Sequence, residues 1–171
     1  NSLSAEALQL LTPITLMHVK LLNDTTRKKI DVLQFFDGYK DGANVFNAFI
    51  SNFSNGNWKK IDKKEWIEVS SIKGTPITIY ANKPLDEKQD LDTKAQEDLQ
   101  DYLDSLDVHP TVVIHRGHSY YVKQTIQQLP ASAKVVLLGS CGGYHSLNDV
   151  LATCPGAHII ASKQVGTGAV N

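Results

Sequence analysis

The fold can be predicted from two stretches of the sequence, TVVIHRGHSYY at 111–121 and AKVVLLGSCGGYHSL at 133–147. Each begins with a continuous run of Val, Ile and Leu, which is typical of a strand buried in a parallel sheet. The first run ends at His115 and His118, and the second ends at Cys141. In open α/β sheets the functional groups lie just beyond the carboxyl ends of the strands. Two neighbouring strands would therefore bring an imidazole and a thiol to one rim of a sheet.

The rest of the chain predicts the elements that surround these two strands. Along the chain, segments with the continuous or alternating apolar residues of strands alternate with segments whose apolar residues recur at helical spacing. The strand-like segments are 31–36, 65–70, 76–80, 111–116, 134–138 and 157–161, and the helix-like ones are 45–53, 91–107, 122–129 and 147–151. Strands that alternate with short helices predict an α/β fold, with a mostly parallel sheet in a three-layer α/β/α sandwich.

We expect this α/β domain to span residues 30–171, behind an N-terminal extension at 1–29. Within the extension, 5–11 has the pattern of a short helix, and 14–22 alternates loosely as a strand does. The stretch 58–64 is rich in lysine. We assign no strand to it.

Composition excludes several classes of function. The 171 residues suit one domain, and 17 basic against 18 acidic residues leave no basic excess for nucleic acid. No apolar run approaches the roughly 20 residues that span a bilayer. Two cysteines are too few for a disulfide framework or a cysteine-based zinc site. We expect Cys154 to be a buried small apolar residue. We predict no metal and no cofactor; if a metal did bind, His115, His118 and His145 would be the first ligands to test.

The start of the chain leaves the compartment open. Residue 1 is not Met, and no signal-peptide pattern follows it. We expect a soluble protein, secreted or periplasmic if the chain is a trimmed mature form. The oligomeric state is not readable from the sequence.

The turn around Cys141 contains what a nucleophilic cysteine requires. Such a residue needs an accessible thiolate, an acid–base partner and N–H donors for the developing oxyanion. Glycines on either side permit a tight turn that leaves backbone N–H groups exposed. The Cys141 N–H is one natural donor, and His118 would activate the thiol or protonate the leaving amine. The alternative is a structural cysteine that occupies a tight turn and takes part in no reaction.

These motifs resemble the caspase–gingipain–legumain–separase clan of cysteine peptidases. GHS at 117–119 is similar to the histidine block of the clan, LLGSCGG at 137–143 to its cysteine block, and PGAHIIAS at 155–162 to the strand that follows. The resemblance implies a caspase-like fold and an endopeptidase that forms a thioester acyl-enzyme on a peptide or protein substrate. It implies His118 and Cys141 as the catalytic dyad.

The resemblance also suggests supporting residues and leaves some assignments open. Gly117, Ser119 and Gly142 would support the oxyanion hole, but the clan usually has glycine directly after the histidine, where this chain has Ser119. His115 also ends the strand, so it stays an alternative to His118, while Arg116 and Ser140 are candidate substrate contacts. The alternative role for Arg116 is a surface ion pair with no part in function. Clan members often continue beyond this point, so the substrate pocket is expected to be incomplete if the chain is truncated at its C-terminus.

Two other functions remain open. A catalytically inactive caspase-like binding module would keep the sheet and lose the working oxyanion hole. GSCGG at 139–143 also fits the G-x-nucleophile-x-G elbow of other hydrolases, in which the histidine follows the nucleophile. His145 and His158 do not suit that role.

Overall fold

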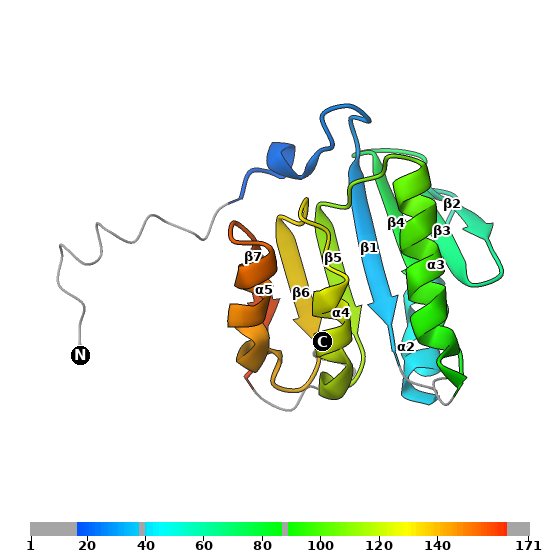
Figure 1. Cartoon of the computed structure of the whole chain (residues 1–171). Helices are drawn as coiled ribbons and strands as arrows, with labels where there is room; N and C mark the ends of the chain where they lie inside the picture. The colour runs from blue at the N-terminus through cyan, green and yellow to red at the C-terminus, as the bar shows by residue number, and fades with distance from the viewer. Residues whose placement is uncertain (1–16, 38–39, 87–88, 164–171) are drawn as a thin grey trace, which may run out of the picture.

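The chain folds into an α/β structure built on one sheet of seven strands (Figure 1). The computed structural model describes residues 17–37, 40–86 and 89–163. The strands are β1 (Ile30–Phe36), β2 (Trp58–Asp62), β3 (Trp66–Ser71), β4 (Ile77–Asn82), β5 (Val112–Arg116), β6 (Val135–Gly139) and β7 (His158–Ala161). Their order across the sheet is β2-β3-β4-β1-β5-β6-β7.

Most of the sheet is parallel. Strand β1 pairs in parallel with β4 on one side and β5 on the other, and β6 and β7 continue the parallel arrangement. The β2–β3 and β3–β4 pairs are antiparallel. All seven residues of β1 are buried, which explains why four of the six residues at 31–36 are apolar.

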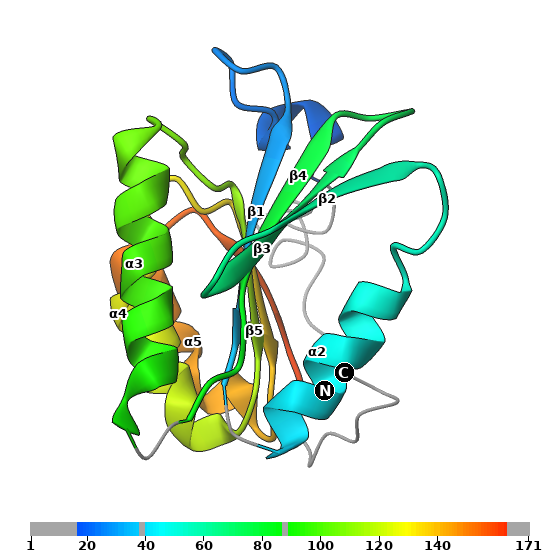
Figure 2. The same ribbon diagram turned by 90° about the vertical axis from the view of Figure 1, so that its right-hand side faces the viewer.

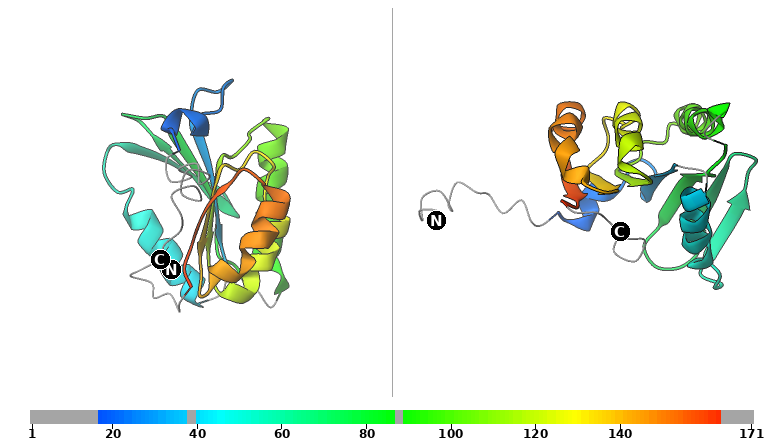
Figure 3. Two further views of the ribbon diagram at one scale, coloured as in Figure 1. Left: turned by 90° about the vertical axis from the view of Figure 1, so that its left-hand side faces the viewer. Right: turned by 90° about the horizontal axis from the view of Figure 1, so that it is seen from below.

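Helices cover both faces of the sheet and make three layers. Helices α3 (Leu91–Ser105), α4 (Val122–Gln127) and α5 (Leu147–Thr153) lie on one face, and α2 (Lys40–Ser51) lies on the other (Figures 2 and 3). The three-layer α/β/α prediction is therefore confirmed. Short 3-10 turns η1 (Val19–Leu22), η3 (Ser119–Tyr121) and η4 (Gly143–Ser146) complete the described elements.

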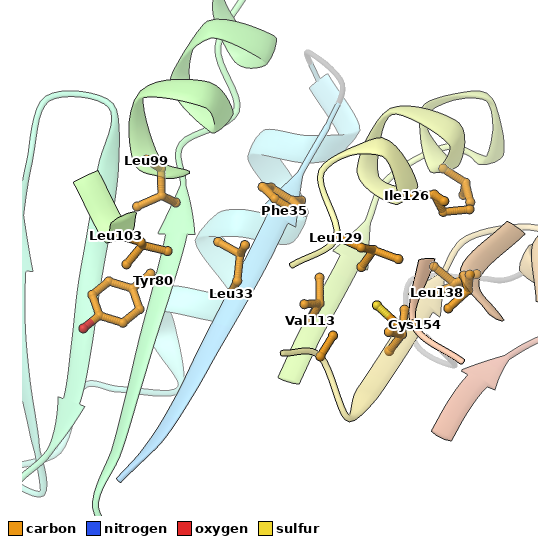
Figure 4. Close-up of a cluster of buried hydrophobic side chains, with 14 of the residues drawn as sticks. Leu33, Phe35, Tyr80, Leu99, Leu103, Val113, Ile126, Leu129, Leu138 and Cys154 are labelled. Atoms are coloured by element: carbon orange, nitrogen blue, oxygen red, sulfur yellow. The ribbon is translucent and has the colours of Figure 1, made fainter. Parts of the chain in front are cut away.

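Each face of the sheet has its own core. The core beneath α3, α4 and α5 includes Leu33 and Phe35 of β1, Leu99 of α3 and Leu138 of β6 (Figure 4). The smaller core beneath α2 is centred on Phe36, which makes edge-to-face contact with Phe46 at 5.2 Å between ring centroids. Strand alternation produces this division, since successive side chains point to opposite faces.

Strand β2 was not predicted from the sequence. The stretch 58–64 was assigned no strand, but Trp58–Asp62 pairs antiparallel with β3 at the edge of the sheet. Four of its five residues are exposed, so burial imposes no apolar pattern on it. Lysines on an exposed edge also discourage pairing with other chains.

Two elements were predicted for the N-terminal extension. The expected helix at 5–11 lies outside the described residues. Of the strand expected at 14–22, the described part contains a 3-10 turn at Val19–Leu22, so that part of the prediction is wrong. None of the helices in the described ranges has the length and apolar character needed to cross a membrane.

Candidate functional site

The loops that contain His118 and Cys141 follow two neighbouring strands of the sheet. Arg116, the last residue of β5, is the parallel register partner of Gly139, the last residue of β6. His118 and Cys141 each follow two residues later. Adjacent strands lie about 4.8 Å apart, so both loops start from neighbouring points on one rim. This is the rim toward which the arrows of β1 and β6 point in Figure 1.

The turn around Cys141 folds back tightly onto the end of β6. Gly142 has a left-handed backbone with φ of 65°, which glycine adopts without strain. A Cβ atom on Gly143 would lie 2.9 Å from Leu138 Cβ and 3.0 Å from its carbonyl oxygen. The Cys141 side chain is partly exposed. The turn therefore needs both glycines and presents the thiol at the rim.

Hydrogen bonds also join the Cys141 turn to the end of β7. Ser162 Oγ donates a hydrogen bond to the Ser140 carbonyl at 3.2 Å, and the Tyr144 N–H donates to the Ser162 carbonyl at 3.1 Å. Ser140 itself is buried, with 2% of its surface exposed. Its side chain is therefore part of the turn's interior, and the structure does not present it as a substrate contact.

His118 lies on the outside of the rim. The residue is exposed and has an extended backbone just before η3. Its ring stacks on the ring of Tyr120, with centroids 5.1 Å apart and planes 7° from parallel. Ser119 is exposed as well and opens the 3-10 turn. The stack limits the directions that the imidazole can take.

His115 lies inside the core on the face covered by α3 and α4. The ring is fully buried, and its Nδ1 lies 2.7 Å from Thr125 Oγ1 of α4 and 3.2 Å from Asp37 Oδ2. Gln96 of α3 donates a hydrogen bond to the other Asp37 oxygen at 2.6 Å. His115 of β5 is thus part of a buried polar cluster with Asp37, which follows β1, Gln96 of α3 and Thr125 of α4.

This polar cluster supports the loop that contains His118. The Asp37 N–H donates to the Arg116 carbonyl at 3.2 Å. A Cβ atom on Gly117 would lie 2.9 Å from Asp37 Cβ, so the loop passes directly against Asp37. Gly117 therefore has a steric role beside the candidate histidine.

Arg116 points to the opposite face of the sheet from His115. It is partly buried and lines a cleft between the sheet and α2. The surface ion pair that the sequence suggested for it is not found, because no carboxylate in the described ranges forms a salt bridge with Arg116. Burial lowers the pKa of its guanidinium.

The second cysteine, Cys154, is buried. Cys154 is 3% exposed and its thiol lies 3.4 Å from the Pro130 carbonyl, so the reading of Cys154 as a buried small apolar residue is confirmed. Neither cysteine is part of a disulfide bond. Within the described residues, no cluster of three or more His, Cys, Asp or Glu side chains is arranged to hold a metal ion.

Sequence reasoning missed the polar cluster around His115. The sequence patterns did not single out Asp37, Gln96 or Thr125 as site residues. One signal was available, because Asp37 follows β1 at the same rim as the motifs after β5 and β6.

No protein-family model matches the chain, and no curated protein matches its sequence.

Proposed function

We propose that this chain is a cysteine endopeptidase of the caspase-like clan, with Cys141 as nucleophile and His118 as acid–base partner. The observation that supports the proposal best is the shared rim. His118 and Cys141 follow neighbouring parallel strands, each two residues beyond the Arg116–Gly139 register pair. Carboxyl ends of neighbouring strands are where α/β proteins assemble reacting groups from separate loops.

The reaction would proceed through a thioester. The Cys141 thiolate attacks the carbonyl carbon of a peptide bond, and the resulting tetrahedral oxyanion collapses as the C–N bond breaks. His118 gives its proton to the leaving amine. Water then attacks the thioester, the C–S bond breaks, and a carboxylic acid and the free thiol are formed. No cofactor is needed for any of these steps.

The oxyanion would be held by backbone donors. The Cys141 N–H lies in the turn that Gly142 and Gly143 make possible, and it is the first donor. The second would come from the loop 117–119, where the clan usually has glycine after histidine and this chain has Ser119. Each such donor contributes about 10²- to 10³-fold to the rate in comparable sites.

His118 is preferred to His115 because of accessibility. His118 is exposed at the rim, while the His115 ring has no exposed surface and is engaged with Thr125 and Asp37. A buried ring cannot reach a peptide bond from outside the core. His115 is therefore proposed as a residue that supports the rim.

The left-handed residue of the cysteine turn favours the peptidase over the nucleophile elbow. In an elbow the strained residue is the nucleophile itself. Here Gly142 has the positive φ, and Cys141 is not among the described non-glycine residues with positive φ.

Cleavage of an unfolded protein substrate tests the proposal. Mass spectrometry would identify the new termini produced by the wild-type chain and by the Cys141→Ala, His118→Ala and Cys154→Ala variants. We expect no cleavage with Cys141→Ala and about 10²- to 10⁴-fold slower cleavage with His118→Ala. Cys154→Ala is the matched control and should cleave at the wild-type rate.

Two results would contradict the peptidase. Cleavage that survives in Cys141→Ala would exclude Cys141 as the nucleophile. A wild-type chain that is folded by circular dichroism and cleaves no bond would favour the inactive binding module.

A further inference from the structure

The face of the sheet that carries α2 is covered by helix over only part of its width. Helix α2 packs on Phe36 of β1, Val69 of β3 and Ala81 of β4. A helix is about 10 Å across and neighbouring strands are about 4.8 Å apart, so one helix covers about two or three strands. Within the described ranges, no helix lies over β5, β6 and β7 on this side (Figure 3).

Strand alternation turns an apolar surface toward this side. Arg116 lines the cleft beside α2, so Ile114 and Val112 of β5 point the same way. Their register partners in β6, and the partners of those residues in β7, extend the surface to the edge of the sheet. We call this set the β5–β7 face, and its members are Val112, Ile114, Val135, Leu137, His158 and Ile160.

The two sides of these strands are buried to different extents. On the side of α3, α4 and α5, Val113, Val136 and Leu138 are at most 1% exposed. On the β5–β7 face, Ile160 is 57% exposed and the other members are partly exposed. Its apolar members belong to neither of the two hydrophobic cores. Contiguous apolar surface in contact with water is unfavourable and marks a place where another element packs.

The N-terminal segment reaches the sheet beside this face. The Thr111 hydroxyl, directly before β5, donates a hydrogen bond to the carbonyl of Leu22, the last residue of η1, at 2.6 Å. Turn η1 lies at that end of the sheet, on the side of α2 (Figures 2 and 3). Val19 and Leu21 of η1 are 59% and 62% exposed. Residues 1–16 therefore continue the chain from one end of the β5–β7 face.

The composition of residues 1–16 suits an apolar surface. Eight of the sixteen residues are apolar, and Glu6 has the only charged side chain. Apolar side chains repeat there at helical spacing, at Leu3, Ala7, Leu10 and Leu11. A helix over 3–16 would be about 20 Å long, and a strand of five residues is about 15 Å long. The segment is therefore long enough to cover the strands from end to end.

Other occupants suit the face less well. The ranges 38–39 and 87–88 contain two residues each, and 164–171 contains three apolar residues and two glycines. A second copy of the chain would have to meet the face in solution. A tethered segment is instead present at a high effective concentration, which favours the intramolecular contact.

We infer that segment 3–16 packs its apolar side onto the β5–β7 face, as a second helix in the layer of α2. The contact removes apolar surface of both partners from water. The packed segment also braces β7, whose end holds the Cys141 turn through Ser162. This packing requires no peptidase activity, so it is independent of the proposed function.

Spin labelling of the full chain tests the contact. A nitroxide is attached to Gln9→Cys, which lies opposite the leucines in the helical pattern and leaves them unchanged. The Cys141→Ala chain is used, so that the partly exposed native thiol takes no label. The matched control is a nitroxide on Ser54→Cys, in an exposed turn before β2, which forms the opposite edge of the sheet from β7.

We expect the Gln9→Cys label to broaden the methyl signals of Leu137 and Ile160 more than those of Leu99, which lies in the opposite core. The Ser54→Cys label should leave the Leu137 and Ile160 signals sharp. If the Gln9→Cys label broadens neither signal, segment 3–16 does not cover the face and the inference is overturned.

A mixed sample separates the chain's own segment from a second copy. It combines spin-labelled chains of natural isotope content with isotope-labelled chains that carry no nitroxide. We expect sharp Leu137 and Ile160 signals in this mixture. Broadening there would overturn the inference, because the segment would then come from another molecule.

Substitution of one leucine supplies the second test. Leu10→Asp places a charge on the apolar side of the segment, and Gln9→Asp places the same charge on the opposite side. We expect Leu10→Asp to lower the urea midpoint of unfolding and to raise the fluorescence of a dye that binds apolar surface, since the β5–β7 face becomes uncovered. Gln9→Asp should match the wild type in both measurements. Equal midpoints and dye signals for the two variants would overturn the inference and leave the proposed peptidase unaffected.

Discussion

Asp37 and His115 meet inside the core, with 3.2 Å between Asp37 Oδ2 and His115 Nδ1. Asp37 follows β1 and His115 belongs to β5, so the contact joins the ends of the two central strands. Thr125 and Gln96 extend it to α4 and α3. Buried polar groups that are linked in this way restrict the arrangement of the elements around them. The loop with Gly117 and His118 is built on this arrangement.

Removal of the Thr125 hydroxyl should destabilise the fold. Thr125→Val keeps the shape of the side chain but leaves His115 Nδ1 without its closest partner. We expect the free energy of unfolding to fall by about 1–3 kcal/mol, the range for a buried polar group that loses its partner. Urea denaturation followed by circular dichroism measures it. Thr153→Val, on the exposed side of α5, is the control and should change stability by less than about 0.5 kcal/mol.

The two thiols should react at different rates. Cys141 is partly exposed, whereas Cys154 is buried and burial raises the pKa of its thiol. Iodoacetamide at neutral pH should therefore add one group to the native chain, at Cys141, and two groups in urea. Intact-mass spectrometry with peptide mapping follows both sites, and Cys141→Ala should gain nothing under native conditions. Native labelling of Cys154 at the rate of Cys141 would contradict the assigned burial.

Cys154 should also make the fold less stable at alkaline pH. Its pKa in the native chain is raised above the ordinary value of 9.0, so its contribution to stability is present below pH 9.0 and is lost as the pH rises further. In that range the unfolded chain releases the thiol proton and the native chain keeps it. Stability should fall by up to about 1.4 kcal/mol per pH unit between the two pKa values.

The comparison of wild type with Cys154→Ala isolates this effect. All other titrating groups are shared, so the decline in unfolding free energy between pH 7.5 and pH 10 should be smaller in the variant. Parallel declines in the two chains would show that Cys154 titrates alike in both states.

Gly117→Ala should displace the loop that contains His118. Its new Cβ would lie 2.9 Å from Asp37 Cβ, closer than real Cβ atoms approach, and Asp37 is held by the polar cluster. If the chain is a peptidase, kcat/KM should fall about tenfold or more, since small displacements of reacting groups have large effects. Gly56→Ala is the matched control, because nothing lies within 4 Å of its new Cβ. Equal activity of both variants would show that the loop tolerates the shift.

The elements with strong apolar patterns were predictable from the sequence. The run 31–36 became β1, and the helical spacing over 91–107 became α3, with Ala95, Leu99 and Leu103 buried. Burial imposes these patterns, so they can be read without a structure. Strand β2 could not be read in this way, because its exposed lysines are held by backbone pairing with β3.

The α/β class, the two strands that end in the His118 and Cys141 motifs, and the burial of Cys154 could all be predicted from local sequence patterns. Three relationships became visible only in the folded chain. Strands β5 and β6 are neighbours in register, His115 faces the core while Arg116 faces the opposite side, and Asp37 lies beneath Gly117. The physical reason is that these relationships join residues far apart in the chain. Local spacing determines which face of its own element a side chain occupies, but the order and register of the strands determine what it meets there.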